Sequence, residues 1–178
     1  GLLIILTIFT FYSGNIQPAR ASKLIVQSMS GNLEQAIVGF QKAIAISPMS
    51  IIEAPEQFSK KIDDYSFDPK QNRATVEKGF TLSIEALKRS IEKGHRDYRL
   101  YLILGRHYNN FFFFSQNQEW LKEAEFYLDK ALELSPKNQQ TYWSLAQTKL
   151  SQQKPDESIG LLQEAVNLEP RYAQSHWY

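Results

Sequence analysis

The segment EAEFYLDKALELSP, at residues 123–136, is followed 34 residues later by the related segment ESIGLLQEAVNLEP, at residues 157–170. A third copy, QAIVGFQKAIAISP, lies at residues 35–48. Each copy has a small residue, then a large apolar residue four positions on, then an alanine three positions after that. Residues at these spacings share one face of an α-helix, and proline ends a helix. The three copies therefore predict three equivalent amphipathic helices. Their framework positions are Ala36, Phe40, Ala43 and Pro48; Ala124, Leu128, Ala131 and Pro136; and Ser158, Leu162, Ala165 and Pro170.

A second helical pattern precedes two of these segments. It reads YLILGRHY at residues 101–108 and YWSLAQTK at residues 142–149, and its framework positions are Leu104, Gly105, Tyr108, Leu145 and Ala146. In the second copy, Lys149 stands where the first has an aromatic residue. An aromatic-x-x-Leu-Gly/Ala opening, followed by Ala-x-x-x-Phe/Leu-x-x-Ala and a proline, resembles the tetratricopeptide repeat. The resemblance implies an all-α solenoid of helical hairpins, in which each hairpin buries its apolar face against its neighbours.

The repeat register predicts how the chain is organised. A first repeat-like unit is followed by a degenerate second unit with a long polar loop, then by a third unit with an insertion and by a regular fourth unit. The insertion contains four consecutive phenylalanines, for which we expect an extended helix with two or three buried rings. The expected boundaries are 1–14 for an apolar segment, 15–50, 51–97, 98–138 and 139–172 for the four units, and 173–178 for the start of a further helix.

The first twelve residues, GLLIILTIFTFY, are apolar and carry no charge. As a helix they would extend roughly 18 Å, whereas a membrane-spanning helix needs about 20 residues. We interpret them as the end of a truncated transmembrane helix that precedes the solenoid, which places the chain at a cell membrane. A signal-peptide segment and a helix buried in a soluble domain are the alternatives. Arg20 and Lys23 indicate the cytoplasmic side only weakly, so the side of the membrane stays open.

The junction between this segment and the first repeat resembles the C-terminal tails of bacterial O-antigen ligase/polymerase-like membrane proteins. The resemblance implies that this chain is the accessory tail of a multi-pass enzyme of the cell envelope, whose catalytic residues lie elsewhere. Pro55 departs from that pattern, which usually has arginine there. A non-enzymatic repeat adaptor, held by one membrane helix or secreted, is the alternative. The matching residues are Asn15, Pro18, Ala21, Ser22, Phe40, Lys42, Ala43, Glu53 and Glu56.

No catalytic, cofactor or metal site is expected in the sequence. The chain has no cysteine, and its three histidines have no metal-ligand spacing. Its 20 basic and 19 acidic residues give a net charge of +1, and the basic residues are not clustered, so nucleic acid is not an expected partner.

The function that the repeats predict is binding of a protein or peptide. In helical solenoids the first helix of each hairpin lines the concave face. The residues expected on that face are Arg99, Arg106, Asn109, Trp143 and Gln147. Their cationic, amide and aromatic groups suit an extended peptide or an acidic group.

Overall fold

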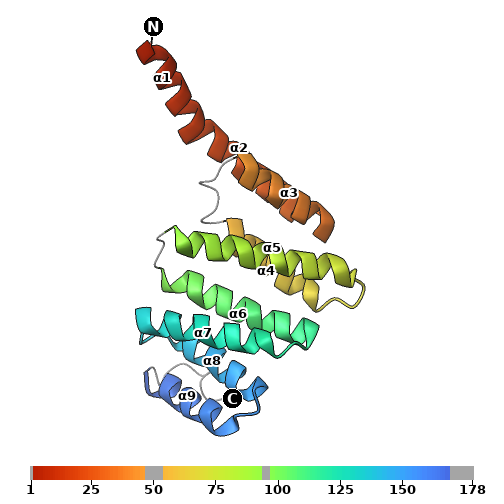
Figure 1. Ribbon diagram of the computed structural model, residues 1–178, viewed down its shortest axis with the longest axis vertical. Helices are drawn as coiled ribbons and strands as arrows, with labels where there is room; N and C mark the ends of the chain where they lie inside the picture. Colours follow the sequence, from red (N-terminus) through yellow and green to blue (C-terminus); the bar gives the residue numbers. More distant parts are fainter. Residues whose placement is uncertain (1, 47–53, 94–96, 169–178) are drawn as a thin grey trace. The chain divides into compact units, whose positions relative to one another are not determined.

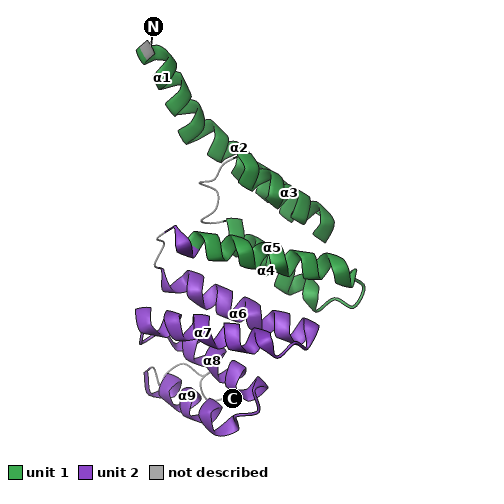
Figure 2. Ribbon diagram, viewed as in Figure 1, with its two compact units in different colours: residues 1–90 green, residues 91–178 purple. Residues whose placement is uncertain are grey.

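The computed structural model describes residues 2–46, 54–93 and 97–168, and all of the regular elements in these ranges are helices (Figure 1). The chain divides into two compact units, residues 1–90 and residues 91–178 (Figure 2). Each unit is built from helical hairpins, so the expected all-α, repeat-like architecture is confirmed within each of them.

Unit 1 begins with α1 (Leu2–Phe11), which continues through a π-helical turn, η1 (Tyr12–Ile16), into α2 (Gln17–Met29). The second helix of the first hairpin is α3 (Leu33–Ile46). Asn32 and Gln35 close the turn between them reciprocally. The Gln35 N–H donates to Asn32 Oδ1 at 2.9 Å, and the Asn32 N–H donates to Gln35 Oε1 at 3.0 Å. This capping box satisfies two N–H groups at the start of α3 that have no partner within the helix.

The next hairpin consists of α4 (Ala54–Ser66) and α5 (Arg73–Glu92), the latter ending just past the unit boundary. The polar loop expected in the second unit is shorter than predicted, because α4 continues to Ser66 and α5 begins at Arg73. Pro55 does not disrupt α4. It occupies the second helical position, where a missing N–H costs no hydrogen bond.

Side chains of α4 hold it against the first hairpin of unit 1. Lys61 Nζ donates to the carbonyl oxygens of Met29, at 2.6 Å, and Gly31, at 3.0 Å. A cation in this place satisfies carbonyls at the end of α2 and opposes the negative end of its dipole. The buried rings of Phe40 and Phe58 stack with their centroids 4.0 Å apart.

Unit 2 contains α6 (Tyr98–Ser115), α7 (Glu119–Leu134), α8 (Gln139–Ser151) and α9 (Pro155–Leu168). The side chains of Asp97 and Asn138 cap α6 and α8 by accepting hydrogen bonds from the N–H groups of Arg99 and Thr141. The capping side chains satisfy N–H groups that the first turn leaves open, and they fix where each hairpin begins. The central apolar cluster of the unit comprises Leu102, Leu128, Ala131 and Leu145, with Tyr101 and Leu161 packed against it.

The predicted framework is largely the buried core. All of its small and large apolar positions in the described residues are buried except Leu162, which is partly exposed, and Pro136 is exposed after the end of α7. Pro48 and Pro170 lie outside the described residues. The small residues act as expected: a Cβ added at Gly105 would lie 2.5 Å from Leu128 Cγ, so glycine allows α6 and α7 to approach closely.

The insertion in the third unit lengthens the helices. α6 has 18 residues and α7 has 16, against 13 and 14 for α8 and α9. Phe111 and Phe112 are buried, and the Phe111 ring stacks on Trp120 at 4.7 Å, whereas Phe113 is exposed. Gln116 ends α6 in the left-handed conformation, with φ of 60°.

The apolar segment at the start of unit 1 does not pack into a core. Seven of its large apolar side chains are between 59% and 81% exposed: Leu3, Ile4, Ile5, Leu6, Ile8, Phe9 and Phe11. Among the described residues, nothing covers these side chains, so the core packing expected of a buried helix is not found there. In the described part of the chain, no helix combines the length and the apolar character needed to cross a membrane.

Candidate functional site

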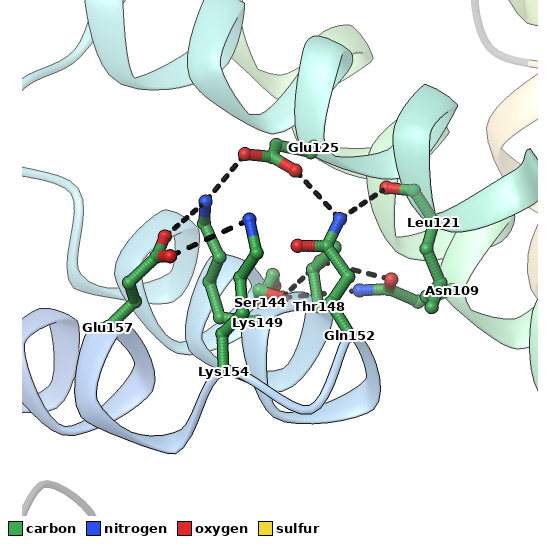
Figure 3. A network of polar contacts seen from close by, with 9 residues as sticks. All are labelled: Asn109, Leu121, Glu125, Ser144, Thr148, Lys149, Gln152, Lys154 and Glu157. Carbon is green, nitrogen blue, oxygen red and sulfur yellow. Dashed lines mark hydrogen bonds and ion pairs between the residues drawn. The ribbon is translucent and has the colours of Figure 1, made fainter. Parts of the chain in front are cut away.

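Asn109 joins the first helices of the two hairpins in unit 2. Its Nδ2 donates to the Ser144 carbonyl at 3.2 Å, and its Oδ1 accepts from Thr148 Oγ1 at 3.0 Å (Figure 3). Asn109 is 1% exposed. Its side chain therefore lies inside the seam between α6 and α8 instead of on the surface where we expected it, and we do not include it among ligand-contacting residues.

The seam has a solvent-facing border on both helices. On α6, the exposed Arg106 lies three residues before Asn109, so the two share a side of the helix. On α8, Trp143 and Gln147 are the sequence neighbours of Ser144 and Thr148 and lie one turn apart. Leu150, three residues after Gln147, lies on the same face of α8. We call Arg106, Trp143, Gln147 and Leu150 the α6–α8 surface.

Arg106 and Arg99 differ in whether the guanidinium is already paired with a carboxylate of the chain. The guanidinium of Arg99 pairs with its own helix cap, with Nε 2.8 Å and Nη2 2.7 Å from Asp97 Oδ2. The hydrogen bond from Arg99 holds the pKa of Asp97 below its ordinary value. Arg106 makes no ion pair with any residue in the described ranges. Of the two arginines that the sequence places on this face, Arg106 is therefore the one suited to an acidic ligand.

Trp143 gives the α6–α8 surface its aromatic group. Its side chain is partly exposed, yet its indole Nε1 is covered and has no hydrogen-bond partner among the described residues. An indole N–H without an acceptor costs about 1–3 kcal/mol. Leu150, two turns further along α8, is 61% exposed. The surface thus combines a cation, an amide and two apolar side chains.

A polar network on α8, separate from the α6–α8 surface, holds three helices of unit 2 together (Figure 3). Lys149 Nζ lies 2.5 Å from Glu125 Oε1 on α7 and 2.6 Å from Glu157 Oε2 on α9. Gln152 Nε2 donates to the second oxygen of Glu125 at 2.7 Å. The Lys149 side chain is only 12% exposed, so its charge needs these carboxylates.

The sequence marked Lys149 as an anomaly without explaining it. An aromatic residue was expected at this position, and Tyr108 is that residue in the preceding hairpin. The structure shows that the lysine is matched by Glu125 and Glu157, one on each neighbouring second helix. A lysine at a core position, with glutamates at suitable places in both flanking helices, was the signal that could have predicted the network.

The network has a defined pH dependence. Burial alone would raise the pKa of Glu125, but hydrogen bonds from Lys149 and Gln152 outweigh it and lower that pKa from 4.5. Burial would lower the pKa of Lys149, but hydrogen bonds to the two glutamates raise it above 10.5. Glu125 therefore stabilises unit 2 fully above about pH 4.5 and loses this effect as the pH falls through its folded pKa. Lys149 contributes below about pH 10.5.

Asp129 has the opposite effect on how stability depends on pH. Its burial, together with the negative charge of Glu125, raises its pKa. Its charged form therefore destabilises the folded state, and that cost is relieved as the pH falls through its folded pKa. Asp129 thus partly offsets the acid sensitivity that Glu125 confers.

We expect Lys149→Met to lower the free energy of unfolding by about 1–3 kcal/mol at pH 7, because the partly buried Glu125 loses its cation, while the exposed Glu157 contributes little. The loss should shrink toward pH 3.5, where protonation removes the carboxylate charges. Urea unfolding followed by circular dichroism at both pH values measures it.

Lys122→Met is the matched control. Its pair with Glu119 is on the surface, with side chains 72% and 66% exposed, so its removal should cost under about 0.5 kcal/mol. Equal effects of the two lysine substitutions at pH 7 would contradict the role given to Lys149.

Among the described residues, no group of three histidine or acidic side chains lies close enough together to hold a metal ion. The buried His107 lies within the packed face of α6.

Comparison with known proteins supports the repeat assignment. A tetratricopeptide repeat model matches residues 114–138, which cover the end of α6, all of α7 and the turn that follows. The match confirms a tetratricopeptide repeat over these residues. The comparison with curated proteins gave no match.

Two solved structures have a similar fold. One, described as the MamA RS-1 ArsTM double mutant, has a TM-score of 0.65 at 16% identity. The aligned region covers 97% of this chain and 85% of the MamA chain. Another, described as MamA, has a TM-score of 0.59 at 18% identity. The aligned region covers 83% of this chain and 74% of that MamA chain. At these identities, the likeness extends to the fold alone.

Proposed function

We propose that this chain is a non-enzymatic repeat scaffold that binds a protein through an extended peptide segment on the α6–α8 surface. The observation that carries the proposal is the exposed border of the α6–α8 seam. Arg106, which has no ion-pair partner among the described residues, lies on one helix, and Trp143, Gln147 and Leu150 lie on the other. The guanidinium suits a carboxylate, the amide suits a peptide group, and the apolar groups suit an aromatic or aliphatic side chain.

The surface is presented on a rigid support. Asn109 fixes α6 against α8, and the Lys149 network fixes α8 against α7 and α9. A preorganised surface binds more tightly because little conformational entropy is lost on association. The proposed function is binding alone. The resemblance to O-antigen ligase tails gains no support from the comparisons, so we do not propose that parentage.

We also propose that the scaffold is held at a membrane by its N-terminal helix. The exposed apolar side chains of α1 support this proposal, since an uncovered apolar surface of this kind marks a contact with another phase or partner.

The binding proposal is tested by selecting a random peptide library on the purified chain and measuring the affinity of the tightest peptide for variants. We expect Arg106→Ala to weaken binding about 5- to 30-fold and Trp143→Ala about 10- to 100-fold, since buried aromatic and arginine anchors carry much of the affinity of such contacts. The selected peptides should combine an acidic residue with an aromatic or aliphatic one.

The control is the double variant Phe126→Ala with Ile159→Ala. These two apolar side chains are 55% and 53% exposed on the second helices α7 and α9. The control should bind within about twofold of the wild type. The proposal is wrong if the control loses affinity and the Arg106 and Trp143 variants keep it.

A further inference from the structure

The apolar exposure of α1 extends around the whole helix. Leu3, Ile4, Ile5 and Leu6 are consecutive and all at least 60% exposed. Successive residues of an α-helix are about 100° apart, so these four face every direction around the axis. A protein groove would cover one side of such a helix, whereas lipid chains surround it.

The polar groups of this helix are satisfied internally. The hydroxyl groups of Thr7, Thr10 and Ser13 donate to the carbonyl oxygens four residues earlier, at 2.8, 2.9 and 2.8 Å. Hydrocarbon offers no hydrogen-bond partners, so the polar groups of a segment placed in it must form hydrogen bonds within that segment. These hydroxyls meet that condition without water.

The continuous apolar surface ends at Tyr12, directly after α1. The ten residues of α1 extend roughly 15 Å, about half of a bilayer's hydrocarbon thickness. Tyr12 is 40% exposed, and its hydroxyl accepts a hydrogen bond from Arg20 Nη1 at 3.3 Å. Tyrosine favours the boundary between hydrocarbon and headgroups, and arginine side chains on a helix point back toward its N-terminus.

Three basic residues follow beyond this boundary. Arg20 and Lys23 are exposed on α2, one turn apart. Lys42 is exposed on α3 and lines the same groove as Leu24, the residue that follows Lys23 on α2. The chain has no acidic residue before Glu34, which lies beside the turn at the opposite end of this hairpin.

We infer that Arg20, Lys23 and Lys42 form a collar that binds the phosphate groups of anionic lipids, with Tyr12 at the hydrocarbon boundary. This inference rests on the proposed membrane attachment and adds the class of lipid. A cation near a membrane surface gains about fivefold in binding from anionic headgroups. The collar therefore selects membranes by charge, and α1 supplies the apolar part of the binding.

The test is flotation of the full chain with two kinds of vesicle, phosphatidylcholine alone and a one-to-one mixture with phosphatidylglycerol. We expect tighter binding to the mixture. The triple variant Arg20→Gln, Lys23→Gln, Lys42→Gln should lose up to roughly 100-fold in affinity for the mixture and stay within about twofold on phosphatidylcholine. The preference for the mixture should also fall with added salt.

A charge-matched control is Lys60→Gln, Lys70→Gln, Lys78→Gln, three exposed lysines in the second hairpin of unit 1 and the turn within it. It should keep the preference for the mixture. Equal binding of the wild type to both vesicles overturns the collar and leaves the membrane attachment standing. No wild-type binding to either kind overturns both.

A second variant tests the attachment alone. Ile5→Asp with Phe9→Asp should abolish binding to both vesicles, while Val26→Asp, an exposed apolar position on α2, should not. If the aspartate pair leaves vesicle binding intact, or if α1 only drives self-association without binding lipid, the inference is wrong.

Discussion

Replacing Tyr108 by alanine is expected to lower the free energy of unfolding of unit 2 by about 3–5 kcal/mol, the usual cost of removing a large buried aromatic side chain. Tyr108 is 1% exposed. Its ring stacks with Trp120 at 5.7 Å and with Tyr127 at 5.8 Å, so one substitution removes both contacts and leaves a cavity between α6 and α7. Urea unfolding followed by tryptophan fluorescence and circular dichroism measures the loss.

Phe126→Ala serves as the control for Tyr108. Phe126 lies on the same second helix as Tyr127 but is exposed, so its removal should cost less than about 1 kcal/mol. A Tyr108→Ala protein with a loss no larger than that of the Phe126 variant would show that the aromatic cluster does not stabilise this hairpin.

Gly39→Ala is expected to destabilise unit 1 by about 2–3 kcal/mol, even though alanine is the better helix former. An added Cβ would lie only 2.1 Å from Ser28 Cβ and 2.4 Å from Ser28 Oγ. The serine Cβ is fixed to the backbone and cannot move away alone, so α2 and α3 would have to separate. Circular dichroism during urea unfolding measures the effect.

A compensating substitution tests the cause of this effect. Ser28→Gly removes the clashing Cβ, so the double variant should recover part of the stability that Gly39→Ala loses. Gly160→Ala in α9, where an added Cβ meets nothing within 4 Å, should keep or raise stability by up to about 1 kcal/mol. If Gly39→Ala behaves like Gly160→Ala, the close contact between α2 and α3 is not required.

The repeat framework could be predicted because it depends on local spacing. Leu128 and Ala131 face the core because of their position on the helix, and Gly105 is needed where Leu128 approaches α6. Both facts follow from residue size and helical periodicity. The fold within each unit was therefore accessible from one sequence.

The surface residues were less predictable because their roles depend on partners from other helices. Asn109 and Arg106 were expected to share one face. The structure shows that Asn109 is used inside the seam, because Ser144 and Thr148 of the next hairpin supply its hydrogen bonds. Arg99 is similarly occupied by Asp97. Periodicity gives the side of a helix, but it does not tell which side chains are already engaged.

The polar network shows the same limit. Lys149 looked like a defect in an aromatic position, because its partners lie 24 residues before it and 8 residues after it. Only the packing of α7, α8 and α9 brings the three charges together. Such a network is invisible to a repeat pattern that records each helix separately.

The central claim, that the α6–α8 surface binds a peptide, is tested most directly by following the indole N–H signals in NMR spectra during titration with the tightest selected peptide. Trp143 lies on that surface, and Trp120 is stacked between Tyr108 and Phe111 as an internal control. The proposal predicts that the Trp143 signal shifts with peptide concentration while the Trp120 signal stays in place. A bound peptide that leaves the Trp143 signal unchanged would contradict it.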